Sequence, residues 1–363
     1  MKQQINLLHF NYSWLSLTEA WLYNLIRFLP PDIQSQIVCK KMDNSSSFDL
    51  PGIQIGSVGR ALKFSGAHIL HSHFADFGWR NMNAAEQAGV KHVVSFYGHE
   101  VCLLPLLDPD WNARFHDMFA RVDAVLCEGE HMAQCIIEDL GCPPEKLYIH
   151  RLGVDLERLP YRPRTWTIGE PLRILIAGSF REKKGIPYAL EAVAKIRKEI
   201  PNVTITIIGD AGPTSTRMAP VKNKIMSTMK DKQLIEHTTL LGFQPHHILV
   251  QEAYRHHLFL SPSFTADDGE TEGGAPVTII EMAATGMPVI STTHCDIPGT
   301  LGLSNKELLV GERDVDGLAQ AIIRLTQMPS WDQLLSENRR HIEQNFSASG
   351  QGCKLAAIYR SLL

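Results

Sequence analysis

Short apolar runs alternate with amphipathic stretches along the whole chain. In the first half, runs typical of buried strands lie at residues 5–10, 36–39, 69–74, 92–96, 124–127 and 147–152. Between them, apolar residues recur at helical spacing at 17–28, 79–88 and 131–140. Short strands that alternate with helices are typical of parallel sheets covered by helices on both faces. The first half therefore predicts a doubly wound α/β domain.

A polar, proline-rich segment interrupts this pattern at 160–169, and we interpret it as a linker. Beyond it we expect strands at 172–178, 203–209, 240–242, 257–261, 288–292 and 308–310. Helices are expected at 186–199, 245–254, 276–284, 315–327 and 331–345, and 352–363 is amphipathic. We therefore predict two doubly wound, Rossmann-like domains, residues 1–165 and 170–345, facing a central cleft. Ligands of such sheets bind at the carboxyl ends of the strands.

Composition narrows the class of protein. The 363 residues are 44% apolar and 20% charged, which suits a globular chain with two domains. A net charge of -4 argues against a nucleic-acid binder. The seven cysteines include no C-x-x-C pair and are typical of free thiols in a reducing compartment. Neither a signal peptide nor an apolar run of about 18 residues is visible, so we expect a cytoplasmic protein.

The most informative segment is 272–290. A loop with two glycines leads into an expected helix whose first residue is a proline (Gly273, Gly274 and Pro276). Free N–H groups at such a helix start can bind a diphosphate. Glu281, about a turn and a half further on, repels phosphate but can accept hydrogen bonds from a ribose diol. The segment therefore predicts a nucleotide-sugar site, in which Glu272 reaches a second set of hydroxyls.

This segment resembles the signature Glu-Gly-x-Pro…Glu-x-x-Ala-x-Gly-x-Pro-Val of retaining glycosyltransferases of family 4, which have the GT-B fold. The family form has seven residues between the glutamates, whereas eight separate Glu272 from Glu281 here. Either the loop bulges by one residue, or Glu270 takes part of the role of the first glutamate. Segments 268–277 and 291–298 look nearest to exopolysaccharide and colanic-acid-type members. The resemblance also implies that residues 346–363 form a helix that crosses back onto the first domain.

The first loop of the second half, 177–185, is small and basic. The family usually has Gly-Arg at its start and Lys-Gly at its end, and Lys184-Gly185 matches the latter. Ser179 stands where the arginine is expected, and Arg181 lies two residues further on. The resemblance implies that Lys184, with help from Arg181, neutralises the donor diphosphate. Taken alone, the loop is equally typical of a solvated, basic helix start.

In the first half, residues 95–100 resemble Phe-His-Gly-x-Asp, whose histidine lies near the transferred sugar. Tyr97 occupies the histidine position, and His99 follows two residues later. A tyrosine hydroxyl can donate a hydrogen bond but is a poor base at neutral pH, whereas a histidine titrates in that range. For each residue a structural role is as consistent with the sequence as a catalytic one.

Two further pairs resemble metal ligands. His71 and His73 lie two apart on one expected strand and so on the same face, but no third ligand is at hand. We expect them to pack or to line the cleft. Asp108-Pro-Asp110 looks like the D-x-D of metal-dependent glycosyltransferases, but the expected fold favours a turn before a helix.

The segment 151–155 resembles the Arg-x-Gly-Val-Asp that ends the first domain of the family. A tight turn at Gly153, with Asp155 as a helix cap, is at least as consistent with it as a ligand contact. Near the N-terminus, aromatic residues could rest on a membrane surface, although such residues more often belong to the core (Tyr12, Trp14, Trp21 and Tyr23).

Together these features predict a retaining, metal-independent glycosyltransferase without a cofactor. It would move a sugar from a nucleotide-sugar donor to a hydroxyl of a glycan or lipid-linked acceptor in polysaccharide biosynthesis, with peripheral contact at the inner face of the membrane. Two alternatives stay open: a nucleotide-sugar epimerase of the same fold, and a catalytically weak sugar-nucleotide-binding partner subunit. The departures at Ser179 and Tyr97 favour the second.

Overall fold

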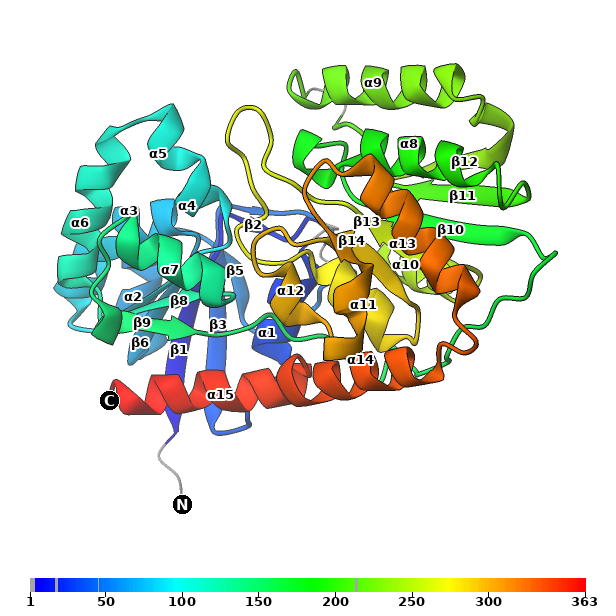
Figure 1. Cartoon of the computed structure of the whole chain (residues 1–363). Helices are drawn as coiled ribbons and strands as arrows, with labels where there is room; N and C mark the ends of the chain where they lie inside the picture. Colours follow the sequence, from blue (N-terminus) through cyan, green and yellow to red (C-terminus); the bar gives the residue numbers. More distant parts are fainter. Residues whose placement is uncertain (1–3, 17–18, 45, 213–214) are drawn as a thin grey trace. The chain divides into compact units, whose positions relative to one another are not determined.

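The computed structural model describes residues 4–16, 19–44, 46–212 and 215–363. The chain forms two compact units. Unit 1 comprises Met1–Asp155 and Asn345–Leu363, and unit 2 comprises Leu156–Gln344. Each unit holds one parallel sheet with helices on both faces (Figure 1). The predicted class, two Rossmann-like α/β domains, is therefore confirmed.

The sheet of unit 1 has seven parallel strands in the order β5-β3-β1-β6-β7-β8-β9. Their bounds are β1 (Ile5–Phe10), β3 (Ile33–Cys39), β5 (Ile53–Ile55), β6 (Ile69–His73), β7 (Lys91–Ser95), β8 (Ala124–Cys127) and β9 (Leu147–Ile149). The short strands β2 (Ser13–Trp14) and β4 (Lys41–Met42) pair separately. The chain reverses its direction across the sheet between β1 and β6, and ligands of open α/β sheets bind at such a switch point.

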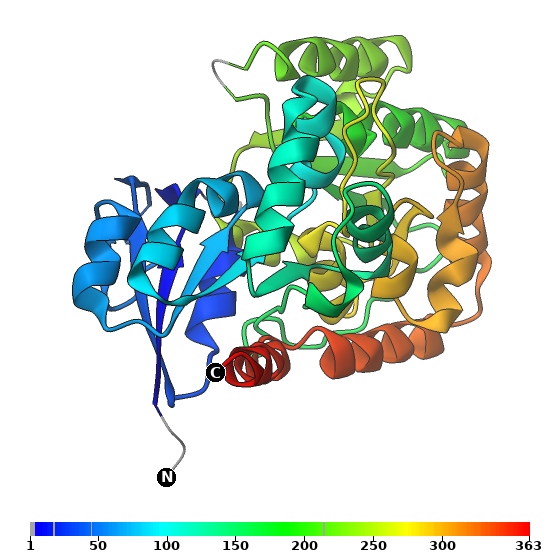
Figure 2. The ribbon, with the colours of Figure 1, turned by 90° about the vertical axis from the view of Figure 1, so that its left-hand side faces the viewer.

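Side chains that alternate along the strands of unit 1 point to opposite faces of the sheet and belong to two hydrophobic cores. On one face, Leu7 of β1 packs with α1 (Ala20–Arg27) and α15 (Ala348–Ser361). On the other, Leu8 packs with α2 (Val58–Ser65) and α3 (Ala75–Ala88), and further along this face lie α6 (Asp110–Arg121) and α7 (Glu130–Glu138). Figures 1 and 2 both show the red helix α15 beside the blue strands and helix of this unit. Short helices α4 (His99–Cys102) and α5 (Leu104–Leu107) precede α6.

The turn at Gly153 packs against the start of α15. The Val154 N–H donates to Phe346 O at 2.8 Å, and Asp155 pairs with Arg27 of α1 at 3.5 Å. A Cβ at Gly153 would lie 2.6 Å from the Ala348 Cα, so only glycine fits this approach. Close packing against α15 therefore explains the glycine of the segment that resembles Arg-x-Gly-Val-Asp.

The sheet of unit 2 has six parallel strands in the order β12-β11-β10-β13-β14-β15. Their bounds are β10 (Leu172–Ala177), β11 (Val203–Ile208), β12 (Thr238–Gly242), β13 (Leu258–Ser261), β14 (Val289–Thr292) and β15 (Leu309–Val310). Figure 1 shows α8 (Ile186–Ile196) and α9 (Met218–Asp231) on one side of this sheet, and α10 (His246–Ala253) and α11 (Val277–Ala284) on the other. The short α12 (Ile297–Thr300), α13 (Val315–Gln327) and α14 (Asp332–Asn345) complete the unit.

The segment 160–169, expected to be a linker, packs onto unit 2. The Arg162 N–H donates to Thr285 O at 2.9 Å. The buried Arg164 guanidinium donates to Ala253 O at 2.7 Å and to Thr285 O at 3.0 Å. Because its charged group is satisfied by carbonyls inside unit 2, this segment is part of that unit.

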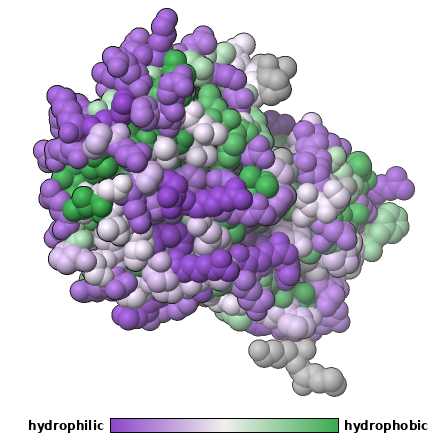
Figure 3. Space-filling view, turned by 90° about the vertical axis from the view of Figure 1, so that its right-hand side faces the viewer, coloured by the Kyte–Doolittle hydropathy of each residue, from purple (hydrophilic) through white to green (hydrophobic). Residues whose placement is uncertain are grey.

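Among the described residues, no helix combines the length and apolar character needed to cross a bilayer. Hydrophilic residues dominate the face shown in Figure 3, and the apolar residues between them form separate small patches.

Candidate active site

Two loops of unit 2 meet at the carboxyl ends of β10 and β13. The loop after β10 ends at Gly185, whose φ of +64° places a hypothetical Cβ 2.0 Å from Pro262 O. A side chain there would collide with the backbone of the other loop. Glycine at this position therefore lets the basic loop 178–185 and the acidic loop 262–276 lie in backbone contact.

Lys184 and Glu272 form the centre of the cluster that these loops create. The Lys184 Nζ atom lies 2.8 Å from Glu272 Oε1 and 2.9 Å from Oε2. Ser263, after β13, donates its hydroxyl to Glu272 Oε1 at 2.8 Å. Lys184 and the Ser263 hydroxyl therefore hold the Glu272 carboxylate, and both follow the ends of strands.

A second carboxylate, Glu270, is also buried beside cations. Arg181 Nη1 donates to Glu270 Oε1 at 2.5 Å, and Lys183 Nζ lies 3.2 Å from the same atom. Lys183 also lies 3.6 Å from Glu272 Oε2 and donates to Thr271 O at 2.7 Å. Lys183, which the sequence predicts only as one of the cations of the basic loop, thus bridges the two glutamates.

These contacts keep both glutamates ionised. Burial acts to raise the pKa of Glu272, but Lys184, Lys183 and the Ser263 hydroxyl outweigh it and lower that pKa to about 2. Burial likewise acts to raise the pKa of Glu270, and Lys183 and Arg181 lower it below its ordinary value. The two loops therefore present two carboxylates and three cations.

The doubled glycine shapes the way into α11. Gly273 has φ +74°, a left-handed turn that suits glycine. The helix begins at Val277, and Pro276 is the capping residue before it. The expectation that Pro276 is the first helical residue is therefore wrong by one position, because its ψ of 125° is still extended. The N–H groups at the start of the helix belong to Val277 and the residues after it.

Glu281 lies within α11, and its side chain is nearly buried. Its Oε1 atom lies 2.7 Å from the Nε2 atom of His246, the first residue of α10. The sequence analysis missed His246, because its only signal was a histidine at the expected start of a helix. This contact places Glu281 beside the loop that follows β12.

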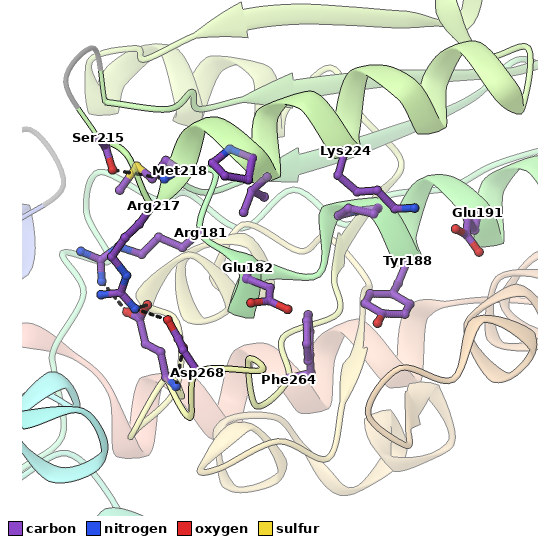
Figure 4. A pocket seen from close by; sticks show the side chains of 14 residues that line it. Arg181, Glu182, Tyr188, Glu191, Ser215, Arg217, Met218, Lys224, Phe264 and Asp268 are labelled. Carbon is purple, nitrogen blue, oxygen red and sulfur yellow. Dashed lines mark hydrogen bonds and ion pairs between the residues drawn. The ribbon is translucent and has the colours of Figure 1, made fainter. Parts of the chain in front are cut away.

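Ser179 and Arg181 lie in the same loop but have different surroundings. Ser179 is close to Gly209, whose φ of +132° and missing Cβ let the loops after β10 and β11 touch. Arg181 turns toward Glu270 and lines a cavity of about 620 Å³ between α8, α9 and the loop 264–270. Figure 4 shows Arg181 and Arg217 beside the acidic side chains of that loop. As far as the described residues show, Lys184, Glu272 and Glu281 do not line this cavity.

In unit 1, Tyr97 follows β7 and belongs to a polar network. Its hydroxyl lies 2.7 Å from the Nδ1 atom of His73, and burial raises its pKa well above the ordinary value. Glu100 accepts from the Ala75 N–H at 3.0 Å and from the Tyr97 N–H at 3.3 Å. Burial raises the pKa of Glu100 to about 7. Glu100, at the position of the family aspartate, thus ties the loops after β6 and β7 together.

His71 and His73 share one face of β6 as predicted, but the expectation that no third ligand is at hand is wrong, because a third histidine lies beside them. His9 of the neighbouring β1 places its Nδ1 atom 3.1 Å from His73 Nε2. His71 lies 2.7 Å from the hydroxyls of both Tyr359 and Ser95, and His9 Nε2 lies 3.3 Å from Ser35 Oγ. Burial lowers the pKa of His9 to about 3. All six ring nitrogens have partners, so the trio is a buried, neutral hydrogen-bond network.

The remaining predicted positions are His99 and the Asp108-Pro-Asp110 segment. His99 is the first residue of α4 and is half-buried. Asp108 pairs with Arg114 at 2.8 Å and accepts from the Asp110 N–H at 3.1 Å, at the start of α6. The Asp108-Pro-Asp110 segment therefore has the structure of the expected turn before a helix.

Comparison with known proteins decides the family. Residues 37–158 match the family model described as Glycosyltransferase Family 4, and residues 171–328 match the model described as Glycosyl transferases group 1. The chain carries a family 4 and a group 1 glycosyltransferase domain. A colanic acid biosynthesis protein, WcaL of Salmonella typhimurium, is 27% identical to this glycosyltransferase over 295 residues, 79% of this chain and 70% of WcaL. The amylovoran biosynthesis glycosyltransferase AmsK of Erwinia amylovora is 29% identical over 237 residues, 65% of this chain and 55% of AmsK.

Solved structures share the fold of this glycosyltransferase over almost its whole length. HepE of Anabaena, in complex with UDP and glucose, has a TM-score of 0.79 at 14% identity, covering 99% of this chain and 100% of HepE. Sucrose-phosphate synthase of Thermosynechococcus elongatus has a TM-score of 0.75 at 16% identity, covering 99% of both chains. The fold is therefore GT-B, as predicted. The family models and the named relatives show that the protein is an enzyme of the transferase class.

Proposed function

We propose that this glycosyltransferase moves a sugar, with retention of its anomeric configuration, from a nucleotide sugar to a hydroxyl of a glycan or lipid-linked glycan in exopolysaccharide synthesis. The observation that carries the proposal is the cluster around Lys184 and Glu272 beside the start of α11. The Lys184 cation and the first N–H groups of α11 match a diphosphate, the Glu272 carboxylate matches the sugar next to it, and the Glu281 carboxylate matches a ribose. The polysaccharide context follows from the names of WcaL and AmsK.

Each group has a role in this proposal. Lys184 and the N–H groups that begin with Val277, next to Gly274, neutralise the diphosphate as it leaves. Glu272 accepts hydrogen bonds from the donor sugar, and Glu281 accepts them from the ribose hydroxyls. Arg181 is paired with Glu270, so it contributes positive charge to the site without contacting the diphosphate directly. Gly273 and Pro276 set the path of the loop, and the small Ser179 leaves room for the donor.

The reaction proposed is a front-face substitution. The acceptor oxygen forms a bond to the anomeric carbon on the face from which the diphosphate departs. The acceptor proton passes to the departing phosphate oxygen, so no protein base is required. This suits Tyr97, whose raised pKa keeps its hydroxyl protonated at neutral pH. Tyr97 and His99 are the proposed contacts of the reacting sugars on unit 1.

The leaving diphosphate carries charge that a metal neutralises in many enzymes. Here Lys183, Lys184 and Arg181 supply three cations, so we propose that transfer needs no metal and no cofactor. An acceptor linked to a lipid would bring the enzyme to the inner face of the membrane. Leu106 and Leu107 of α5, 63% and 66% exposed, are apolar contact points for such a surface.

A donor screen followed by product analysis tests the proposal. Thermal shift against UDP-, GDP- and ADP-sugars identifies the donor, because a ligand of the folded state raises the melting temperature. The stabilising donor is then incubated with cell-envelope glycolipid, and the anomeric configuration of the product is read by NMR. A product that keeps the donor configuration supports the proposal. An inverted product refutes retention, and a new nucleotide sugar formed without acceptor identifies an epimerase.

A further inference from the structure

His294, which is buried, and Glu312, which is partly exposed, form a pair that the roles above do not use. His294 follows β14 and Glu312 follows the neighbouring β15, so both lie at the carboxyl edge of the unit 2 sheet. The His294 Nδ1 atom lies 2.6 Å from Glu312 Oε1, and the His294 side chain is 1% exposed. The ends of two adjacent strands therefore place a charge-assisted hydrogen bond at the edge of the sheet where the acidic loop lies.

The second nitrogen of His294 faces hydrogen-bond donors. The Glu272 N–H points to His294 Nε2 at 3.1 Å, and Cys295 Sγ lies 3.2 Å from the same atom. Burial raises the pKa of Cys295 to about 12, so its thiol keeps a proton to donate. Nε2 must then be the lone-pair nitrogen, and Nδ1 must carry the hydrogen that it donates to Glu312. The carboxylate of Glu312 selects this tautomer.

The same pair holds the acidic loop at two points. Glu312 Oε2 accepts from the Thr265 N–H at 2.8 Å, where the loop leaves β13. His294 accepts from the Glu272 N–H, seven residues later in the sequence. The segment between these anchors carries Glu270. Glu272 is thus fixed through its backbone by His294 and through its carboxylate by Lys184 and Ser263.

We infer that His294, oriented by Glu312, is a positioning residue that sets the place of the Glu272 carboxylate relative to the donor sugar. This inference rests on the proposed role of Glu272. His294 acts through the backbone of Glu272 and touches no reacting atom. Its effect should therefore appear in the rate of the chemical step, whereas the diphosphate and ribose contacts stay in place.

Two substitutions test the contacts of the two imidazole nitrogens of His294 separately. In His294→Gln the amide oxygen takes the place of Nε2 and can still accept from the Glu272 N–H, but the link to Glu312 is lost. In His294→Asn the amide takes the place of Nδ1 and can still donate to Glu312, but it does not reach Glu272. Each variant loses one hydrogen bond, so their melting temperatures should fall by similar amounts. His116→Asn, an exposed histidine of unit 1, is the control.

The assay is hydrolysis of UDP-glucose, UDP-galactose, GDP-mannose or ADP-glucose, using the compound that the wild type turns over. A misplacement of about 1 Å can lower a rate by about a hundredfold, so we expect kcat of His294→Asn to fall at least about 30-fold with KM within about threefold. We expect kcat of His294→Gln to stay within about fivefold of the wild type. Glu312→Ala removes the carboxylate that selects the tautomer of His294, so it should lower kcat as His294→Asn does.

The outcomes are distinguishable. If the wild type turns over a donor and the Asn and Gln variants behave alike, the positioning role is overturned and the proposed function stands. A fall in kcat that simply follows melting temperature across the three variants also overturns it. If the wild type hydrolyses none of the four donors, the proposed function fails, and the positioning role fails with it.

Discussion

The Nε2 atom of His246 lies 2.7 Å from Oε1 of Glu281, although the two residues are 35 positions apart. The contact joins the first residue of α10 to the middle of α11. A ribose bound to Glu281 would therefore lie next to His246, so both side chains should determine affinity for the nucleotide.

Replacing Glu281 should weaken donor binding. Glu281→Ala removes the acceptor of two hydrogen bonds to the ribose, and bonds to a charged group contribute about 1.5–3 kcal/mol each. We expect the dissociation constant to rise at least about tenfold, as measured by calorimetry. Glu236→Ala, an exposed glutamate of the same unit, is the control and should bind as the wild type does. Unchanged affinity in Glu281→Ala would refute the ribose assignment.

Lys184 should serve both stability and donor binding, and a double substitution separates these effects. Lys184→Met leaves the nearly buried Glu272 without its nearest cation, which should cost about 3 kcal/mol of stability in urea unfolding. Adding Glu272→Gln should restore most of that loss without restoring donor affinity. Lys195→Met removes an exposed pair with Asp316 and should cost less than about 1 kcal/mol. If the double variant bound donor with wild-type affinity, Lys184 would not hold the diphosphate.

Stability at low pH should depend on Glu272. Its pKa of about 2 in the folded protein lies below the ordinary 4.5, so the folded state favours the ionised form. The resulting stabilisation is fully present above about pH 4.5, is lost as pH falls toward 2, and amounts to about 3 kcal/mol. Melting temperatures of the wild type and Glu272→Gln from pH 6 to pH 2.5 test this. The gap between them should narrow as pH falls, and a constant gap would contradict the cited pKa.

Activity should survive chelation, because side chains neutralise the diphosphate. We expect transfer in excess EDTA to match transfer in its absence. Loss of activity that manganese restores would contradict metal independence. It would also direct attention back to Asp108-Pro-Asp110, whose first carboxylate pairs with Arg114 in this structure.

Gly153→Ala should destabilise unit 1. The new Cβ would lie 2.6 Å from the Ala348 Cα, so either the turn or α15 must move. We expect a cost of about 2 kcal/mol, seen as a lower melting temperature. Gly299→Ala meets no atom within 4 Å and is the matched control. Equal melting temperatures would show that α15 is not held closely at this turn.

The sequence predicts those parts of the fold where apolar runs are long. Strands β1, β8 and β10 and helix α13 lie within a residue of their expected bounds. Strand β5 was missed because it lies at the sheet edge and has no buried residue, and α9 because only three of its residues are buried. An element that buries little carries little apolar pattern, so periodicity alone does not reveal it.

The residues of the candidate site likewise fall into those that the sequence predicted and those that it did not. Glu272 and Glu281 were predicted from the motif in which they stand, and Lys184 was predicted from the resemblance to the family. His246, Ser263, His294 and Glu312 were missed, because each follows a different strand and meets the site only when the sheet forms. His9 was missed for the same reason, since it lies on β1 while its partners lie on β6. Glu270 and Glu272 also have different cation partners, Arg181 and Lys184, which the spacing does not reveal.

A crystal structure with the donor that most raises the melting temperature tests the central claim most directly. The account predicts the diphosphate within hydrogen-bond distance of Lys184 Nζ and of the first N–H groups of α11, with the ribose diol on Glu281. Electron density for the same compound elsewhere on the chain, with Lys184 still joined only to Glu272, would contradict it.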